Sequence, residues 1–127
     1  MSLDLWLEAD ERLSRPTLIR LLNTLGASRV ASETGVDQYA YPSGLSACPM
    51  ENEGNPRIKA EDPRGLNFKV NSRCILRTDL ASYDESVGDL KRLLFEIASQ
   101  TGAYFVVSSQ LESALYVHQG EGVEACK

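Results

Sequence analysis

Apolar and polar residues alternate along two stretches of the chain, and apolar residues at helical spacing follow each stretch. In the first, Leu3, Leu5 and Leu7 recur at every second position, the period that turns one face of a strand toward a core. The second and longer alternation runs from Phe68 to Arg77 and has one apolar and one basic side. The pattern therefore predicts two strands, each leading into a helix.

The first predicted helix has residues suited to its start and its end. The Ser14 hydroxyl can cap the free N–H groups of a first turn, and Pro16 lies where the missing N–H of proline is tolerated. Gly26 can adopt the left-handed conformation that ends a helix. Together with the leucine spacing, these residues predict a helix over about residues 15–25.

The second predicted helix follows Asp79. Ser82 or Asp84 can cap its start, and Gly102 can end it. Its apolar side chains form one stripe, as expected of a helix that lies on a core: Val87, Leu90, Leu94, Ile97 and Ala98.

Further strands are expected before and after these two units. Residues 29–41 predict a hairpin or a bent strand, because polar residues and Gly35 interrupt β-branched and aromatic ones. Residues 103–109 predict a buried strand, and residues 114–118 predict the second strand of a hairpin. The tail that begins at Gly120 is expected to fray.

Prolines and glycines recur over about residues 42–66, where neither a helical nor a strand period is sustained. We expect a long loop there, and a loop of this length inside a compact domain is typically functional or disordered.

The order β-α-β, loop, β-α-β-β predicts one α+β domain over residues 1–127. The expected fold is a ferredoxin-like (split β-α-β) two-layer sandwich, an antiparallel sheet of four to five strands with two helices on one face. The right-handed crossover rule places the first strand beside the strand that starts at Asn67, in the centre. The other sheet face is expected to be free and to carry Asp4, Trp6, Glu8, Lys69, Arg73, Ile75 and Arg77.

The chain has 127 residues and a formal net charge of −5, a balance that repels phosphate backbones and suits a basic partner. Its three cysteines are odd in number and share no C-x-x-C spacing, and no basic, apolar leader follows Met1. We therefore expect a cytoplasmic location. No apolar run approaches the roughly 20 residues that span a membrane.

The sequence contains no complete catalytic motif. His118 has no positioned partner nearby and is expected to be a solvated histidine on a terminal strand. The histidine and the cysteines lack the paired spacing of a metal site, and Gly120-x-Gly122 opens no helix. We expect no enzyme, no cofactor and no metal; a cleft joining His118 to a carboxylate would favour an enzyme instead.

Direct nucleic-acid binding is not expected either. An open sheet can stack bases, and Lys69, Arg73 and Arg77 would supply cations, but the aromatic-and-glycine pattern of an RNA-recognition strand is missing. We expect these cations to pair across strands with Asp4, Glu8 or Asp37.

The run from Phe105 to Glu112, which leads into Ala114 to Val117, resembles the small bacterial immunity proteins encoded beside interbacterial toxins, as do the chain's size and acidity. Those are single acidic domains that block a cognate toxin, commonly a nuclease. The resemblance implies a non-enzymatic inhibitor that occludes the active site or functional surface of a basic protein toxin.

For such an inhibitor, the expected partner contacts are acidic loop residues and aromatic anchors: Glu51, Glu53, Glu61 and Asp62, with Trp6, Tyr39 and Tyr41. The alternative is a small-molecule-sensing or oligomerising domain whose open sheet face pairs with a second copy. The sequence leaves monomer and homodimer both open.

Overall fold

The structure is a computed structural model that describes residues 2–30, 37–50, 56–61, 66–112, 114–119 and 122–126. These residues form, in chain order, β1 (Ser2–Ala9), α1 (Arg15–Thr24), β2 (Ser28–Val30), β3 (Gln38–Ala40), β4 (Ser46–Pro49), β5 (Ser72–Asp79), the 3-10 helix η1 (Leu80–Ser82), α2 (Tyr83–Thr101), β6 (Phe105–Ser109), β7 (Ala114–His118) and β8 (Val123–Ala125).

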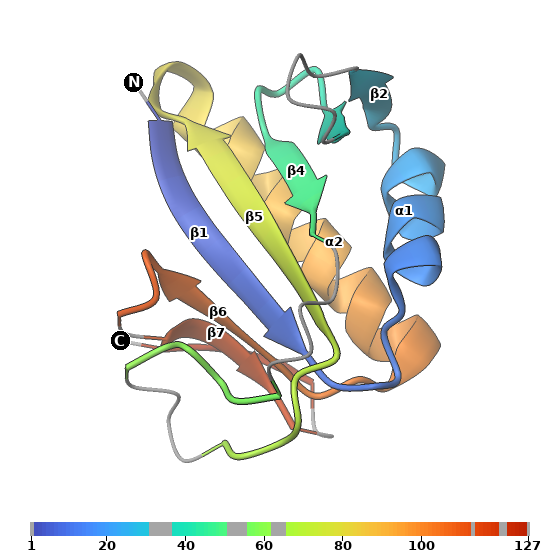
Figure 1. Ribbon diagram of the computed structural model, residues 1–127. Helices are drawn as coiled ribbons and strands as arrows, with labels where there is room; N and C mark the ends of the chain where they lie inside the picture. The colour runs from blue at the N-terminus through green and yellow to red at the C-terminus, as the bar shows by residue number, and fades with distance from the viewer. Residues whose placement is uncertain are drawn as a thin grey trace.

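All the described strands belong to one eight-stranded antiparallel sheet in the order β2-β3-β4-β5-β1-β6-β7-β8 (Figure 1). The α+β class agrees with the sequence, but the predicted ferredoxin-like sheet of four to five strands is wrong. The sheet is wider because short strands are added on both sides of the central ones.

The strands that the pattern missed are those too short to show a period. β4 lies inside the stretch expected to be a loop, and β8 lies in the stretch expected to fray. β2 and β3 form the hairpin that was one of two expectations for residues 29–41. Each of these strands has three or four residues, so the neighbouring strand, and not its own alternation, makes it a strand.

β1 and β5 are neighbours in the middle of the sheet, as predicted, but they run antiparallel. The crossover rule applies to parallel strands, so it is not the reason for their pairing. Their register places Leu5 opposite Leu76 and Leu7 opposite Cys74, and these four side chains are buried in the core on the helix side.

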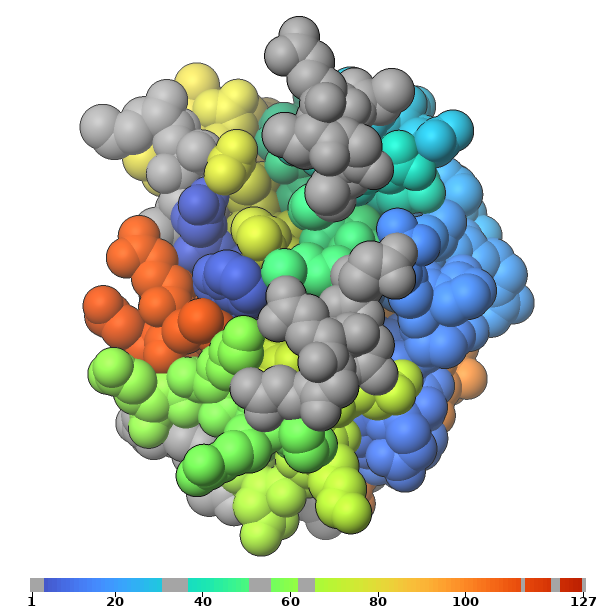
Figure 2. Space-filling view, in the orientation of Figure 1, coloured from blue at the N-terminus to red at the C-terminus, as the bar shows by residue number. Residues whose placement is uncertain are grey.

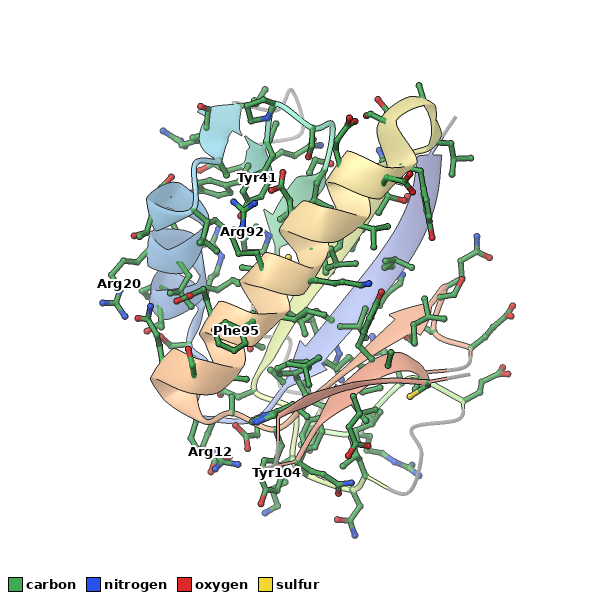
Figure 3. All side chains as sticks on the ribbon, turned by 180° about the vertical axis from the view of Figure 1, so that it is seen from behind. Arg12, Arg20, Tyr41, Arg92, Phe95 and Tyr104 are labelled. Atoms are coloured by element: carbon green, nitrogen blue, oxygen red, sulfur yellow. The ribbon has the colours of Figure 1, made fainter. Side chains whose placement is uncertain are left out.

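Both helices pack on this side of the sheet and contact each other (Figures 1 and 3). α1 begins as predicted, with the Ser14 hydroxyl accepting a hydrogen bond from the Thr17 N–H at 3.2 Å. α2 ends at Gly102 in the left-handed conformation, with φ of 68°. Leu21 of α1 and Leu90 of α2 are both buried in the same core.

The opposite face of the sheet was expected to be free, but it is partly covered. Residues 56–61 and 66–70, which we call the covering segment, cross it in front of β6 and β7 (Figure 1). Phe68 begins the apolar side of the predicted alternation, which should lie on the face opposite to that of Lys69 and therefore under the helices. It packs instead against a second, smaller core that includes Val106 and Val117. The alternation before Ser72 therefore belongs to the covering segment and not to a strand.

Candidate interaction surface

A buried carboxylate holds the covering segment on the sheet. Glu8 is fully buried, and its oxygens accept hydrogen bonds from the N–H groups of Lys59 at 2.7 Å and Ala60 at 3.0 Å. The Arg73 Nε lies 3.1 Å from the same carboxylate, and its Nη2 donates to the Arg57 carbonyl at 2.6 Å. A buried charge needs such a set of partners, so this half of the face has a structural role.

The other half of the face presents the chain's single tryptophan. Trp6 lies in register between Ile75 of β5 and Ser108 of β6, and Ile75 pairs with Cys48 of β4. The side chains of Trp6, Ile75 and Cys48 are half-buried. In Figure 2 the atoms of β1, in dark blue, reach the surface between β5 and β6. We call Cys48, Ile75 and Trp6 the Trp6 strip.

An exposed ion pair borders the Trp6 strip. Asp4 Oδ1 and Arg77 Nε lie 2.7 Å apart, with side-chain exposures of 40% and 51%. This pair and the pair of Glu8 with Arg73 confirm the expected cross-strand pairing of the basic side of β5. Lys69, the third cation expected there, lies in the covering segment and is exposed.

The predicted contact residues are divided between the two faces. Trp6 lies on the strip, and Glu61 is exposed on the same face, where its N–H donates to the Leu111 carbonyl at 2.8 Å. Tyr39 and Tyr41 are 4% and 6% exposed and belong to the core under the helices, so the structure does not bring them to Trp6. The remaining three, Glu51, Glu53 and Asp62, lie outside the described residues.

His118 is buried, not solvated as expected. Its ring is stacked on Phe105 with 5.4 Å between centroids, and its Nδ1 lies 2.6 Å from the Ala103 carbonyl. A carbonyl only accepts, so Nδ1 carries the proton and donates it. This burial was not predictable from the sequence, because β8, which makes β7 an inner strand, was not predicted. The surroundings of His118 indicate a packing role.

A second candidate surface, which the sequence did not indicate, is a hollow on the helix side between α2 and the last two strands. Two pockets of about 140 and 190 Å³ meet at Tyr116 and Ala125. α2 contributes Tyr83, Val87 and Lys91 to their walls. Burial here, with Tyr83 nearby, raises the pKa of Tyr116. We call this hollow the α2–β8 groove. It was not predicted because β8, which forms one of its walls, was not predicted.

Within the described parts of the chain, no group of His, Cys, Asp or Glu side chains can hold a metal ion. Cys48, Cys74 and Cys126 are free thiols. Neither α1 nor α2 has the length and apolar composition needed to cross a bilayer.

No protein-family model, no curated protein and no solved structure matches this chain.

Proposed function

We propose that this protein is a non-enzymatic protein-binding module of the immunity or inhibitor type. Its partner is a basic protein, such as a nuclease toxin, and it acts by covering the partner's active site or functional surface. The observation that carries the proposal is the Trp6 strip, a half-buried tryptophan beside an exposed arginine–aspartate pair. Tryptophan and arginine are enriched among the residues that contribute most to protein interfaces.

The position of the strip in the sheet favours binding. Trp6 lies on the central strand β1, which pairs on both sides along most of its length. A surface that is rigid before binding loses little conformational freedom on association, which favours affinity.

Charge supports a basic partner. The support comes from the net charge of the whole chain, which is −5; on the face of Trp6 itself, Glu61 is exposed together with the cations Lys69 and Arg77. Opposite charge on a partner speeds association and disfavours acidic competitors.

The test is co-expression with the product of the neighbouring reading frame, followed by purification of the complex. Trp6 is the only tryptophan of this chain. Its fluorescence therefore reports contact on the strip once the emission of the partner alone, measured at the same absorbance, is subtracted. We expect an equimolar complex, a shifted Trp6 emission, and at least about tenfold weaker binding for Trp6→Ala, as for interface residues of this kind.

Phe95→Ala is the matched control, because Phe95 is 61% exposed on α2, on the opposite side of the molecule (Figure 3). Equal effects of the two substitutions would contradict the role of the strip. A tight dimer formed without any partner, with Trp6 emission that depends on protein concentration, would favour the oligomerising alternative.

A further inference from the structure

The sheet ends at β8, and none of the described residues pairs with the outer side of this strand. An edge strand offers unpaired N–H and C=O groups to any extended chain that approaches it. Long or flat edges are usually protected by charge, proline or a covering element. β8 is short and has one charged residue, Glu124, between Val123 and Ala125.

The backbone groups that β8 offers can be identified from its pairing with β7. The Cys126 N–H donates to the Leu115 carbonyl at 2.7 Å. In an antiparallel ladder successive residues turn their backbone groups alternately toward and away from the neighbour. Glu124 and Cys126 therefore bond toward β7, and Val123 and Ala125 direct their N–H and C=O groups outward.

The side chains of β8 alternate between the two faces of the sheet. Val123 and Ala125 line the α2–β8 groove together with Tyr116 and Lys91. Glu124, opposite Val117 in the register, is exposed on the other face of the sheet. A strand added outside β8 would place alternate side chains beside the groove and the one between them beside Glu124.

We propose that the outer edge of β8 binds an extended segment of a partner protein by strand addition, with a lysine or arginine opposite Glu124 between two apolar residues. The inference rests on the proposed function only in taking the partner to be a protein. Main-chain hydrogen bonds supply affinity in this mode of recognition, and the alternate side chains supply specificity.

Charge argues against a second copy of this chain as the occupant. If β8 pairs with β8 of another copy so that Val123 and Ala125 bond to each other, Glu124 lies directly opposite Glu124 of that copy. Like charges at directly opposed positions destabilise a sheet. The other edge strand, β2, carries Arg29, but this side chain is already bonded to Asp37, with Nε 2.8 Å from Oδ2.

Three blocked synthetic peptides test the inference: one with a Val-Lys-Val core, one with a Val-Glu-Val core, and one with the Val-Lys-Val core N-methylated at both valines. Each is titrated into the labelled protein and followed by amide chemical shifts. The Val-Lys-Val peptide should shift Val123 and Ala125, with shifts extending to Lys91 and Tyr116. The N-methylated peptide should shift none of them, because it cannot donate to the edge.

Two substitutions complete the test. Glu124→Lys should reverse the preference between the lysine and glutamate peptides, changing their affinity ratio about fivefold, in keeping with cross-strand charge pairs. Glu112→Lys, the same charge change at an exposed position in the β6–β7 turn, should leave the ratio unchanged. Ala125→Pro removes an outward N–H without touching the β7 ladder and should abolish binding.

Equal binding of the lysine and glutamate peptides, shifts that avoid β8, or self-association of the unbound protein at the concentrations used would each overturn the inference. The proposed function can fail separately. If Ala125→Pro and wild type bind the co-expressed partner equally through Trp6, the proposed function stands and the β8 inference falls. If no basic partner binds while the peptides do, the reverse holds.

Discussion

The Glu8 carboxylate lies 3.1 Å from the Arg73 guanidinium, and these side chains are only 0% and 7% exposed. On the same two strands Asp4 and Arg77 form a similar pair at 2.7 Å, with exposures of 40% and 51%. The covering segment makes the difference, because it lies over the first pair and leaves the second in water. One sheet face therefore holds a buried and an exposed version of the same interaction.

Replacing one partner of each pair should have unequal effects. Glu8→Gln leaves the Arg73 charge buried without its carboxylate and should lower the free energy of unfolding by about 3 kcal/mol. Asp4→Asn removes an exposed pair and should cost less than about 1 kcal/mol. Urea unfolding followed by circular dichroism measures both; equal losses would contradict the structural role assigned to Glu8.

A second prediction concerns the turn between β3 and β4. Gly44 has φ of +95°, and a Cβ placed there would lie 2.6 Å from the Cβ of Asp79. The turn is also held by the Ser86 hydroxyl, which donates to the Ser43 carbonyl at 3.0 Å, so it is not free to move away. Gly44→Ala should therefore strain the backbone and also bring the new Cβ into a clash with the Cβ of Asp79, which cannot rotate away from it.

Gly26 provides the matched control, because its φ is +102° and no atom beyond its two chain neighbours lies within 4 Å of the corresponding Cβ. Gly26→Ala should cost about 1 kcal/mol through backbone strain alone. Gly44→Ala should cost at least about 1 kcal/mol more, since clashes of this kind rank among the larger single-residue effects. Thermal unfolding of the two variants decides the matter, and equal melting temperatures would show that the turn adjusts without cost.

The parts of the fold that the sequence predicts are those with a repeating pattern. α2 shows a helical stripe over several turns, and β1 alternates over most of its length, so local pattern and final structure agree. β4 and β8 have four and three residues, too few to repeat anything, and they exist because a neighbouring strand accepts their hydrogen bonds. The pairing with another strand is not visible in the few residues of the strand itself.

The residues of the candidate surfaces were also predictable only where they lie on a periodic strand. Trp6 was identified because it alternates with leucines on a periodic strand. Tyr39 and Tyr41 were expected at the surface, but they belong to the core, because β3 and the turn after it place them under the helices. The α2–β8 groove was missed altogether, since one of its walls is a strand that shows no period.

A third prediction concerns the reactivity of the thiols, which reports whether the core is packed as the structure shows. Cys74 is fully buried on the helix side, and burial raises the pKa of its thiol. Cys126 is half-exposed near the end of the described chain. Since the thiolate is the reactive form, iodoacetamide at pH 8 should modify Cys126 in the folded protein and leave Cys74 unmodified. In concentrated guanidinium both should react; equal rates in the folded protein would contradict the packing of β5 against the helices.

The last prediction concerns the pH dependence of stability. The Tyr41 hydroxyl is buried between α1 and α2 beside Arg92 (Figure 3), and it has no hydrogen-bond partner among the described residues. Burial, with the Asp89 charge nearby, raises its pKa to about 12. In the unfolded chain the value is about 10. The folded protein therefore keeps a proton that the unfolded chain loses, and stability should fall as the pH rises from about 10 to 12.

Tyr41→Phe should remove this alkaline loss, which amounts to at most about 2–3 kcal/mol for a shift of this size. At pH 7 the same substitution should be neutral or stabilising, since it deletes a buried hydroxyl that gains no hydrogen bond. Tyr83→Phe is the control, because Tyr83 is 45% exposed. The measurement is the free energy of unfolding in urea between pH 7 and 11.5. If wild type and Tyr41→Phe lose stability in parallel above pH 10, the hydroxyl is not held in the buried position that the structure gives it.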